Sequence, residues 1–332
     1  MAETAPPTQT FNVAAVVQAG RLGFEAVLLA ASLRACDPDF AGRLILLEPQ
    51  PGPRWPTDPR LAHDGVRALL AEFGAEILPF ESRHFGAAYP HGNKIEGLAA
   101  LPEAPFLFLD TDTLVTGALS AVPFDFDRPS ASMRREGTWP EPQPYADLDA
   151  IWAPLYARFS LDYAASLDAA QPPGHWQRNL YFNAGWFFHR SPRIFGKRFL
   201  DIALSIRNDT PECLAAQSLD PWLDQVALPL AIHALGGGRP GPGLAGLDGD
   251  VTCHWRRLPL LYARESDRVV EVLEGVARRQ EVRRVLRDWE PARRMIFRNE
   301  GRKARALFDR ADLPAREQAI RAGLKRAGLW LR

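Results

Sequence analysis

Short apolar segments alternate with longer segments of helical periodicity along most of the chain. Each apolar segment is only a few residues long and rich in Val, Leu and Phe, which predicts strands buried on both faces. In the longer segments apolar side chains recur at helical spacing, as Phe24, Leu28 and Ala31 do, which predicts amphipathic helices. The predicted strands are residues 11–18, 44–47, 75–79, 105–109 and 183–189, and the predicted helices are residues 21–35, 63–73, 93–101, 195–207 and 220–235.

This alternation indicates an α/β fold with a single, mostly parallel central sheet flanked by helices. Ligands of such sheets collect at the carboxyl ends of the strands, and the strand at 105–109 runs directly into Asp110. Residues 125–144 are rich in Pro, Arg and Glu and are predicted to form an excursion or lid. Residues 236–249 are rich in Gly and Pro but lack the Gly-Lys-Ser/Thr of a phosphate-binding loop, so they are interpreted as a connection only.

From Glu265 onward the pattern is helical and rich in Arg, without strands. The sequence therefore predicts a catalytic domain over residues 11–262 and a basic helical C-terminal extension over residues 263–332. The formal net charge is zero, but residues 254–332 hold 21 Lys and Arg against 11 Asp and Glu. An acidic body with a basic C-terminal segment can dock within the molecule or meet an anionic surface.

The end of the extension is a basic amphipathic stretch. Leu313, Ile320, Leu324 and Leu331 follow helical spacing, with basic residues between them. Such a helix can make weak peripheral contact with an anionic membrane, with Trp330 near the headgroups. We favour the alternative that the same stripe packs on the acidic body, because a single short helix binds membranes weakly.

Cysteine use and the absence of targeting segments narrow the class of protein. The three cysteines are widely spaced and form no Cys-x-x-Cys pair, so neither a disulfide framework nor a zinc ribbon is predicted. Residues 1–10 are polar, unlike a signal peptide, and no run approaches the roughly 20 apolar residues that span a bilayer. We expect a cytoplasmic protein. Nucleic acid is an improbable partner, because the basic residues lie on acid-interspersed helical sequence without interleaved aromatic residues.

The candidate chemistry centres on Asp110, Thr111 and Asp112. Alternate residues of an extended segment face the same way, so both carboxylates can address one hard cation and a diphosphate. A nucleotide-sugar needs this, because its departing diphosphate must be neutralised as the sugar–oxygen bond breaks. The structural alternative is a pair of solvated acids capping a helix. It is weakened by the four large apolar residues that precede Asp110, which place the pair at the edge of a sheet.

A second enzyme class also fits this motif. Haloacid-dehalogenase-like, magnesium-dependent phosphohydrolases use a strand ending in Asp-x-Asp-x-Thr, which would make Asp110 the nucleophile and Asp112 the acid. In that fold the motif usually stands near the start, whereas here more than a hundred residues precede it. Asp248 and Asp250 could supply the later acidic pair of that class, but they follow a Gly-rich loop.

Three later segments separate the two classes. They are Tyr-Phe-Asn-Ala-Gly-Trp-Phe-Phe at 181–188, Trp-Leu-Asp-Gln at 222–225 and Cys-His-Trp at 253–255. With Asp-Thr-Asp before them, and in this order, the chain resembles the GT-A nucleotide-diphospho-sugar transferases. It is most similar to glycosyltransferase family 8, which includes glycogenin and bacterial galactosyltransferases. The resemblance spans roughly residues 12–262.

The resemblance implies a GT-A fold and a nucleotide-diphospho-sugar donor, with a hydroxyl-bearing acceptor such as a glycan. It implies a metal, usually Mn²⁺ or otherwise Mg²⁺, held by Asp110, Asp112 and His254. It places Asn183, Asp224 and Gln225 near the reacting carbon, and it places Gln18 at the nucleoside pocket and Lys94 against the donor. The family's late motif continues from His to Gly and then Lys-Pro-Trp. This chain instead has Trp-Arg-Arg-Leu-Pro after His254, so the diphosphate contacts are expected to pass to Arg256 or Arg257.

Each of these residues also has a purely structural interpretation. Asn183 can satisfy a turn, Asp224 can be a charge favoured at a helix N-terminus, and Lys94 can be a solvated helix charge. His254 beside a tryptophan can be a packed core histidine, and only its order after the Asp pair favours a metal ligand. The main alternative to an enzyme is a non-catalytic, transferase-like binding scaffold. The two intact aspartates favour the enzyme.

Overall fold

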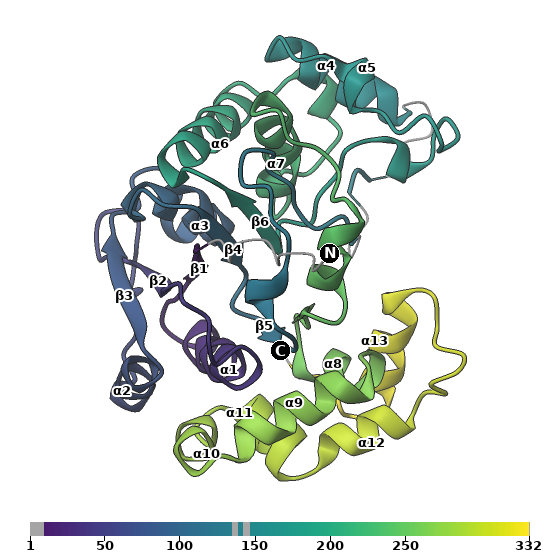
Figure 1. Cartoon of the computed structure of the whole chain (residues 1–332). Coiled ribbons are helices and arrows are strands. Elements are labelled where there is room, and N and C mark those ends of the chain that lie inside the picture. The colour runs from purple at the N-terminus through teal and green to yellow at the C-terminus, as the bar shows by residue number, and fades with distance from the viewer. Residues whose placement is uncertain (1–9, 135–138, 142–146, 332) are drawn as a thin grey trace, which may run out of the picture.

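The computed structural model describes residues 10–134, 139–141 and 147–331 (Figure 1). Its central sheet has the strand order β3-β2-β1-β4-β6, in which the first four strands are parallel and β6 is antiparallel to β4. The predicted α/β architecture with a mostly parallel sheet is confirmed. The strands are β1 (Asn12–Val16), β2 (Leu44–Pro49), β3 (Ala75–Phe80), β4 (Phe106–Leu109) and β6 (Trp186–His189).

Alternate residues of the central strands enter two different cores, because successive side chains of a strand point to opposite faces. Val13 and Ala15 belong to one hydrophobic cluster, whereas Ala14 and Val16 belong to the other. The first cluster lies under α1 (Arg21–Cys36) and α2 (Asp64–Glu72). The second lies under α3 (Asn93–Glu96), α6 (Pro192–Asn208) and α7 (Leu223–Ala234), with α4 (Leu148–Arg158) and α5 (Tyr163–Ser166) further out (Figure 1).

A second, two-stranded antiparallel sheet is an addition to the single predicted sheet. It pairs β5 (Thr113–Val115) with β7 (Thr252–His254). The sequence pattern indicated a short extended piece near His254 but not its partner. That pairing joins segments far apart in the chain, and local periodicity carries no information about it.

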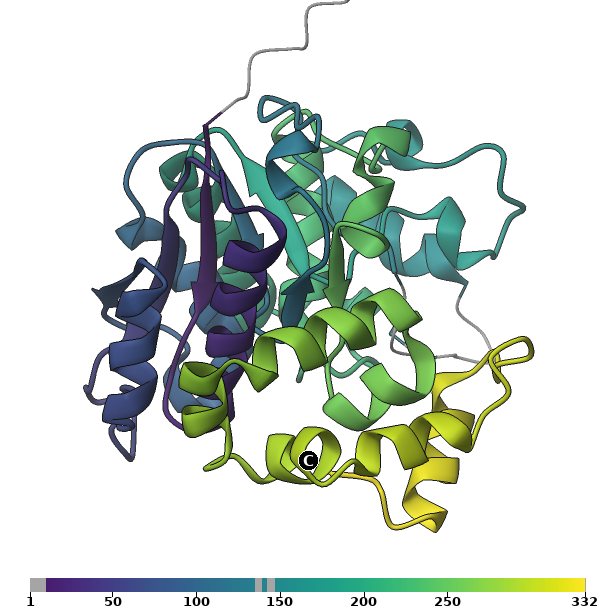
Figure 2. The same cartoon turned by 60° about the horizontal axis from the view of Figure 1, so that its bottom comes forward.

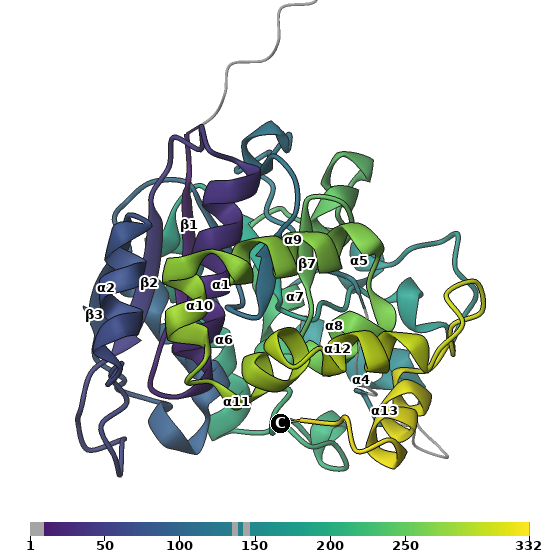
Figure 3. The same ribbon diagram turned by 90° about the horizontal axis from the view of Figure 1, so that it is seen from below.

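The C-terminal region is helical, as predicted, and it packs on α1 (Figures 2 and 3). This corrects the prediction that α1 is amphipathic: residues 25–33 are buried without interruption, because the sheet covers one side of the helix and α9 and α10 cover another. The helices are α8 (Leu258–Arg264), α9 (Asp267–Arg278), α10 (Gln280–Leu286), α11 (Glu290–Ala292), a π-helical turn (Arg293–Phe297), α12 (Glu300–Ala306) and α13 (Glu317–Arg326).

The apolar stripe of the last helix is occupied. Ile320 and Leu324 of α13 are 1% and 0% exposed and join the same hydrophobic cluster as β1 and α1. The structure therefore supports packing of this stripe on the body. In the part of the chain that the structure describes, no helix is both long and apolar enough to cross a membrane.

Several predicted boundaries differ from the observed ones. The strand predicted at 183–189 begins only at Trp186, because Ala184 has a φ of 57° and turns the chain. The helix predicted from residue 220 begins at Leu223, after Pro221, and the helix predicted at 93–101 ends as a 3-10 turn. The predicted connection at 236–249 contains a 3-10 helix (Pro242–Asp248). The predicted lid at 125–144 and the polar segment at 1–10 lie partly outside the described residues.

Candidate active site

A cavity of about 730 Å³ opens at the carboxyl ends of β1 and β4. This is the edge at which parallel sheets place their ligands. The residues that the resemblance assigns to the site all line this cavity: Gln18, Lys94, Asp110, Thr111, Asp112, Asn183, Asp224, Gln225, His254, Arg256 and Arg257. Segments spread over most of the chain thus converge on one place.

The small β5–β7 sheet brings His254 to the two aspartates. Asp110 follows β4 directly and Asp112 immediately precedes β5, whose first residue, Thr113, pairs with His254. The backbone carbonyl of Asp112 also accepts a hydrogen bond of 2.9 Å from the Trp255 amide. As a result His254 Nε2 lies 3.1 Å from Asp112 Oδ1 and 3.8 Å from Asp110 Oδ2.

The charges of this pair stabilise each other. Burial by itself lowers the pKa of His254, but the Asp112 carboxylate outweighs burial and raises that pKa above its ordinary value. Burial by itself raises the pKa of Asp112, but His254, with Arg21 and Lys94 nearby, holds the pKa of that carboxyl well below its usual range. The carboxylate of Asp112 is therefore ionised at neutral pH.

These three side chains fit a divalent metal. One ligand atom from each of Asp110, Asp112 and His254 can be chosen so that all three lie within 4.8 Å of one another. Two carboxylate oxygens with one imidazole nitrogen suit Mn²⁺ or Mg²⁺ rather than a thiolate-preferring metal. The acidic pair Asp248 and Asp250, considered for a phosphohydrolase, is not in this group. Asp248 instead accepts hydrogen bonds from Ser132 and from the Trp186 indole.

Lys94 connects the aspartate pair with α7. Its side chain is 7% exposed, and its Nζ lies 2.7 Å from Asp110 Oδ1 and 3.5 Å from Asp224 Oδ2. It also donates a hydrogen bond of 3.1 Å to the Ala184 carbonyl. Burial lowers the pKa of Lys94, but the carboxylates of Asp110 and Asp224 overcome burial and raise it, so the amine stays charged. The solvated surface lysine considered for this position is thereby excluded.

Asp224 and Gln225 are held at the start of α7 by two tyrosines. The Tyr89 hydroxyl accepts a hydrogen bond from the Asp224 amide and donates one to Asp224 Oδ1, both at 2.9 Å. Burial and the Asp224 charge raise the pKa of Tyr89 far above its ordinary value, so the phenol remains a donor. Tyr181 donates to Gln225 Oε1 at 2.5 Å. No sequence motif indicated Tyr89.

Asn183 is fixed by hydrogen bonds on both sides of its amide. Its Nδ2 donates to the Arg134 carbonyl at 2.7 Å, and its Oδ1 accepts from the Gly185 amide at 2.8 Å. Gly185 is required beside it because a Cβ at that position would lie 2.4 Å from His254 Nδ1. The Asn-Ala-Gly segment therefore packs directly against His254.

The beginning of α1 also lines the cavity. Arg21 Nη1 donates to the Arg256 carbonyl at 3.2 Å and lies 4.0 Å from Asp112 Oδ2, while its Nε lies 3.3 Å from Glu25 Oε1. Burial, reinforced by the Asp112 charge, raises the pKa of Glu25 well above its ordinary value. Glu25 also lies 3.5 Å from the Thr111 hydroxyl. Gln18, which precedes α1 and also lines the cavity, accepts a hydrogen bond from Asn93.

Two arginines that follow His254 in the chain, Arg256 and Arg257, also line the cavity. Arg256 has a φ of 63°, which turns the chain from β7 into α8. Its Nη1 lies 2.7 Å from Glu317 Oε2 of α13. Burial lowers the pKa of Arg257, and the positive charge of Arg21 lowers it further. The cavity is also lined by Arg21 and by Arg321, Lys325 and Trp330 from the C-terminal extension, none of which the sequence pattern assigned to the site.

Comparison with known proteins gives one family. The family model described as Rhodobacterales glycosyltransferase domain matches residues 13–236. Among solved structures, the galactosyltransferase LgtC in complex with donor and acceptor sugar analogues has a TM-score of 0.48 and 15% identity, over 83% of this chain and 99% of LgtC. The apo structure of the bifunctional glycosyltransferase WbbM has a TM-score of 0.46 and 13% identity, over 84% of this chain and 51% of WbbM.

The apo form of the glycosyltransferase GlyE of Streptococcus pneumoniae TIGR4 has the same TM-score of 0.46 and identity of 13%, over 84% of this chain and 63% of GlyE. No curated protein matches the chain.

Proposed function

The chain belongs to the Rhodobacterales glycosyltransferase domain family, and we propose that it transfers a sugar from a nucleotide-diphospho-sugar to a hydroxyl acceptor with the help of a divalent metal. The observation that carries the proposal is the convergence of Asp110, Asp112 and His254 in one cavity. We infer that residues 11–262 form the transferase domain and that residues 263–332 are an extension packed on it. The three free cysteines suit a reducing, cytoplasmic location.

The proposed metal ligands are Asp110, Asp112 and His254. When bound there, Mn²⁺ or Mg²⁺ would supply positive charge to the diphosphate as that group leaves. The Asp112 carboxylate raises the pKa of His254, so a metal bound there would compete with a proton for the imidazole nitrogen.

The remaining residues bind and orient the two substrates. The acceptor oxygen attacks the anomeric carbon, and the bond between that carbon and the diphosphate oxygen breaks. Arg256 and Arg257 line the same cavity as Asp112 and are proposed to hold the diphosphate, and Gln18 is proposed to contact the nucleoside. We assign Asn183, Asp224 and Gln225 to the sugar and the acceptor, since hydrogen bonds hold each of them rigidly at the cavity wall.

Lys94 is proposed to orient Asp110 while its charge reaches toward the donor. Its ammonium group contacts both Asp110 and Asp224, one on the metal side and one on the sugar side of the cavity. Thr111, between the two aspartates, is 5% exposed, so we propose that its backbone rather than its hydroxyl faces the donor.

A thermal-unfolding panel tests this proposal. The purified protein is mixed with nucleotide-sugars carrying uridine, guanosine, adenosine or thymidine diphosphate, each with Mn²⁺, with Mg²⁺ or with EDTA. We expect one donor to stabilise the protein only when metal is present, by about 2.7 kcal/mol at a donor concentration of 100 times the dissociation constant. Asp112→Asn should abolish both this stabilisation and turnover, whereas Asp209→Asn, at an 84% exposed side chain, should change neither.

Two results would contradict the proposal. One is stabilisation and full turnover in EDTA. The other is hydrolysis of simple phosphate monoesters with a phosphorylated Asp110, which would restore the phosphohydrolase hypothesis.

A further inference from the structure

The last helix of the chain forms one wall of the cavity. Arg321 and Lys325, one turn apart on α13, line it together with Trp330, which follows the helix. The ring of Trp330 lies 5.4 Å from the Arg321 guanidinium in a cation–π contact, which orients that guanidinium. Figure 3 shows α13 near α8 and α12, and α13 is in contact with α8.

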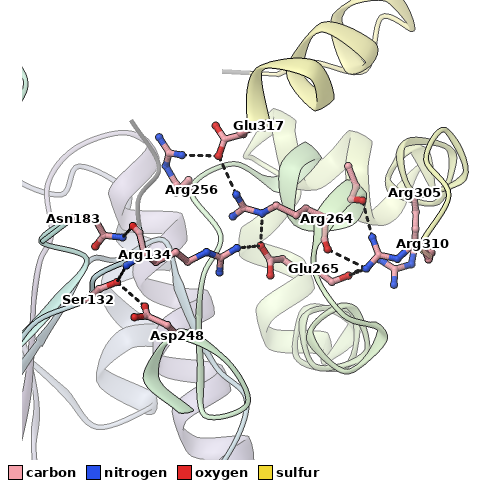
Figure 4. Close-up of polar contacts among 11 residues, drawn as sticks. Ser132, Arg134, Asn183, Asp248, Arg256, Arg264, Glu265, Arg305, Arg310 and Glu317 are labelled. Carbon is pink, nitrogen blue, oxygen red and sulfur yellow. Dashed lines mark hydrogen bonds and ion pairs between the residues drawn. The ribbon is translucent and has the colours of Figure 1, made fainter. Parts of the chain in front are cut away.

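Two features hold α13 in this position. Ile320 and Leu324 anchor its inner face in the hydrophobic core. At its first residue, Glu317 accepts from Arg256 at 2.7 Å and from Arg264 at 3.0 Å (Figure 4). Because Arg256 lies next but one to His254, this ion pair ties α13 to the segment that carries the proposed metal ligand.

The same network continues to the other side of the cavity. Arg264 pairs with Glu265, and Glu265 pairs with Arg134, whose carbonyl accepts from Asn183 (Figure 4). Both ends of this chain of contacts are at cavity-lining residues, Arg256 and Asn183. The extension is thus built into the site and not merely attached to the domain.

The wall around α13 carries excess positive charge. Arg21, Arg256, Arg257, Arg321 and Lys325 all line the cavity, whereas the lining carboxylates are Asp110, Asp112 and Asp224. Asp110 and Asp224 already contact Lys94. Glu317 compensates Arg256 and Arg321, but the Lys325 side chain has no ion pair or hydrogen bond within the described residues. Cations gathered on one concave wall attract an anion.

We propose that α13 is part of the donor site and that Lys325 and Arg321 bind the phosphates of the nucleotide-sugar. This inference rests on the proposed function, and it adds that the C-terminal extension contributes directly to donor affinity. Trp330 is a positioning residue, which acts through its cation–π contact with Arg321.

A matched pair of variants on the same helix tests the proposal. Lys325 and Arg326 are adjacent, exposed and basic, but only Lys325 lines the cavity. Isothermal titration measures the affinity of the full-length protein for uridine, guanosine, adenosine and thymidine diphosphates, each with Mn²⁺. One of these nucleoside diphosphates is expected to bind the unaltered protein. We expect Lys325→Ala to lower the affinity for it by about tenfold, the size of one charge-assisted hydrogen bond. Arg326→Ala should leave the affinity unchanged.

A charge-reversing pair sharpens the result. Lys325→Glu should weaken binding more than Lys325→Ala does, whereas Arg326→Glu should not weaken it. Because the Lys325 side chain is exposed, all four variants should keep the unfolding temperature of the unaltered protein. In steady-state assays the loss should appear in KM for the donor and not in KM for the acceptor.

The outcomes separate this inference from the proposed function. Binding by the unaltered protein with no difference between Lys325→Ala and Arg326→Ala would overturn the role of α13 and leave the transferase proposal standing. A loss confined to acceptor KM would also overturn it. Failure of the unaltered protein to bind any of the four nucleoside diphosphates with Mn²⁺ would overturn both.

Discussion

At the scale of single residues, the site depends on side chains that each serve two partners. Lys94 contacts Asp110 at the end of β4 and Asp224 at the start of α7. Tyr89 both accepts from and donates to Asp224. Groups held in this way lose little conformational freedom when a substrate binds, which favours a preorganised site.

Gly185→Ala is expected to damage the metal site. A Cβ at Gly185 would lie 2.4 Å from His254 Nδ1 and 2.9 Å from Asn183 Oδ1, so the imidazole has to move. We expect Mn²⁺ affinity, measured by electron paramagnetic resonance, to fall about 10- to 100-fold, as when the surroundings of a ligand are disturbed. Gly238→Ala is the control, because nothing lies within 4 Å of its Cβ. Unchanged Mn²⁺ affinity in Gly185→Ala would argue against His254 as a ligand.

Tyr89→Phe is expected to lower both stability and turnover. Loss of the Tyr89 hydroxyl leaves the Asp224 amide and one oxygen of the Asp224 carboxylate without their partner. The free energy of unfolding, measured with denaturant, should fall by about 1–3 kcal/mol. Tyr163→Phe removes a comparable hydroxyl, bonded to Asp149 and Asn179 away from the cavity. Both variants should be less stable, but only Tyr89→Phe should reduce kcat. Equal kcat values would show that Tyr89 only stabilises the fold.

At the scale of secondary-structure elements, two short segments determine what the cavity contains. The β5–β7 pair brings His254 to Asp112, and α13 brings two cations to the same cavity. Each segment is too short to be stable alone, so its position depends on what packs around it. For α13 that includes the ion pairs of Glu317.

Glu317→Ala is expected to destabilise the protein by about 3 kcal/mol, because the largely buried carboxylate, 12% exposed, serves three arginines. Those arginines are Arg256, Arg264 and Arg321. Glu81→Ala, which breaks the exposed pair with Arg83, should cost less than about 1 kcal/mol. Urea unfolding of the two variants measures the difference. Similar small losses in both would mean that these ion pairs do not hold α13 in place.

At the scale of the whole molecule, the extension and the transferase domain share one hydrophobic core. Leu273 and Ile320 of the extension belong to the same cluster as Val13 of β1 and Leu28 of α1. The extension carries a net positive charge and the rest of the chain a net negative one, and the interface between them buries apolar surface. This arrangement favours a single cooperative unit over two independent domains.

Removal of residues 311–332 is expected to lower solubility and thermal stability. The truncation exposes surface that Ile320, Leu324 and Leu329 cover, and each such side chain contributes roughly 1.5–3 kcal/mol when buried. Co-sedimentation with anionic vesicles should show little binding by the full-length protein. Salt-sensitive binding that disappears on truncation would instead establish the membrane role.

The sequence by itself determined the alternation of strands and helices and the place of Asp110 and Asp112 at the end of β4. These features follow from local periodicity, because the spacing of apolar residues within a strand or helix indicates which of its faces are buried. The resemblance to the GT-A transferases, carried by the order of the later segments, also implied Asn183, Asp224 and His254 as candidates, although no local pattern showed that they meet.

Only the tertiary structure decided which distant segments meet and which faces they cover. The pairing of β5 with β7, the two-sided burial of α1 around Glu25, and the approach of Lys325 to the cavity all depend on contacts between residues far apart in the chain. A basic amphipathic helix has the same pattern whether its apolar face meets a membrane or a core. Its polar face likewise has the same pattern whether it meets water or a ligand, so the distinction comes only from packing.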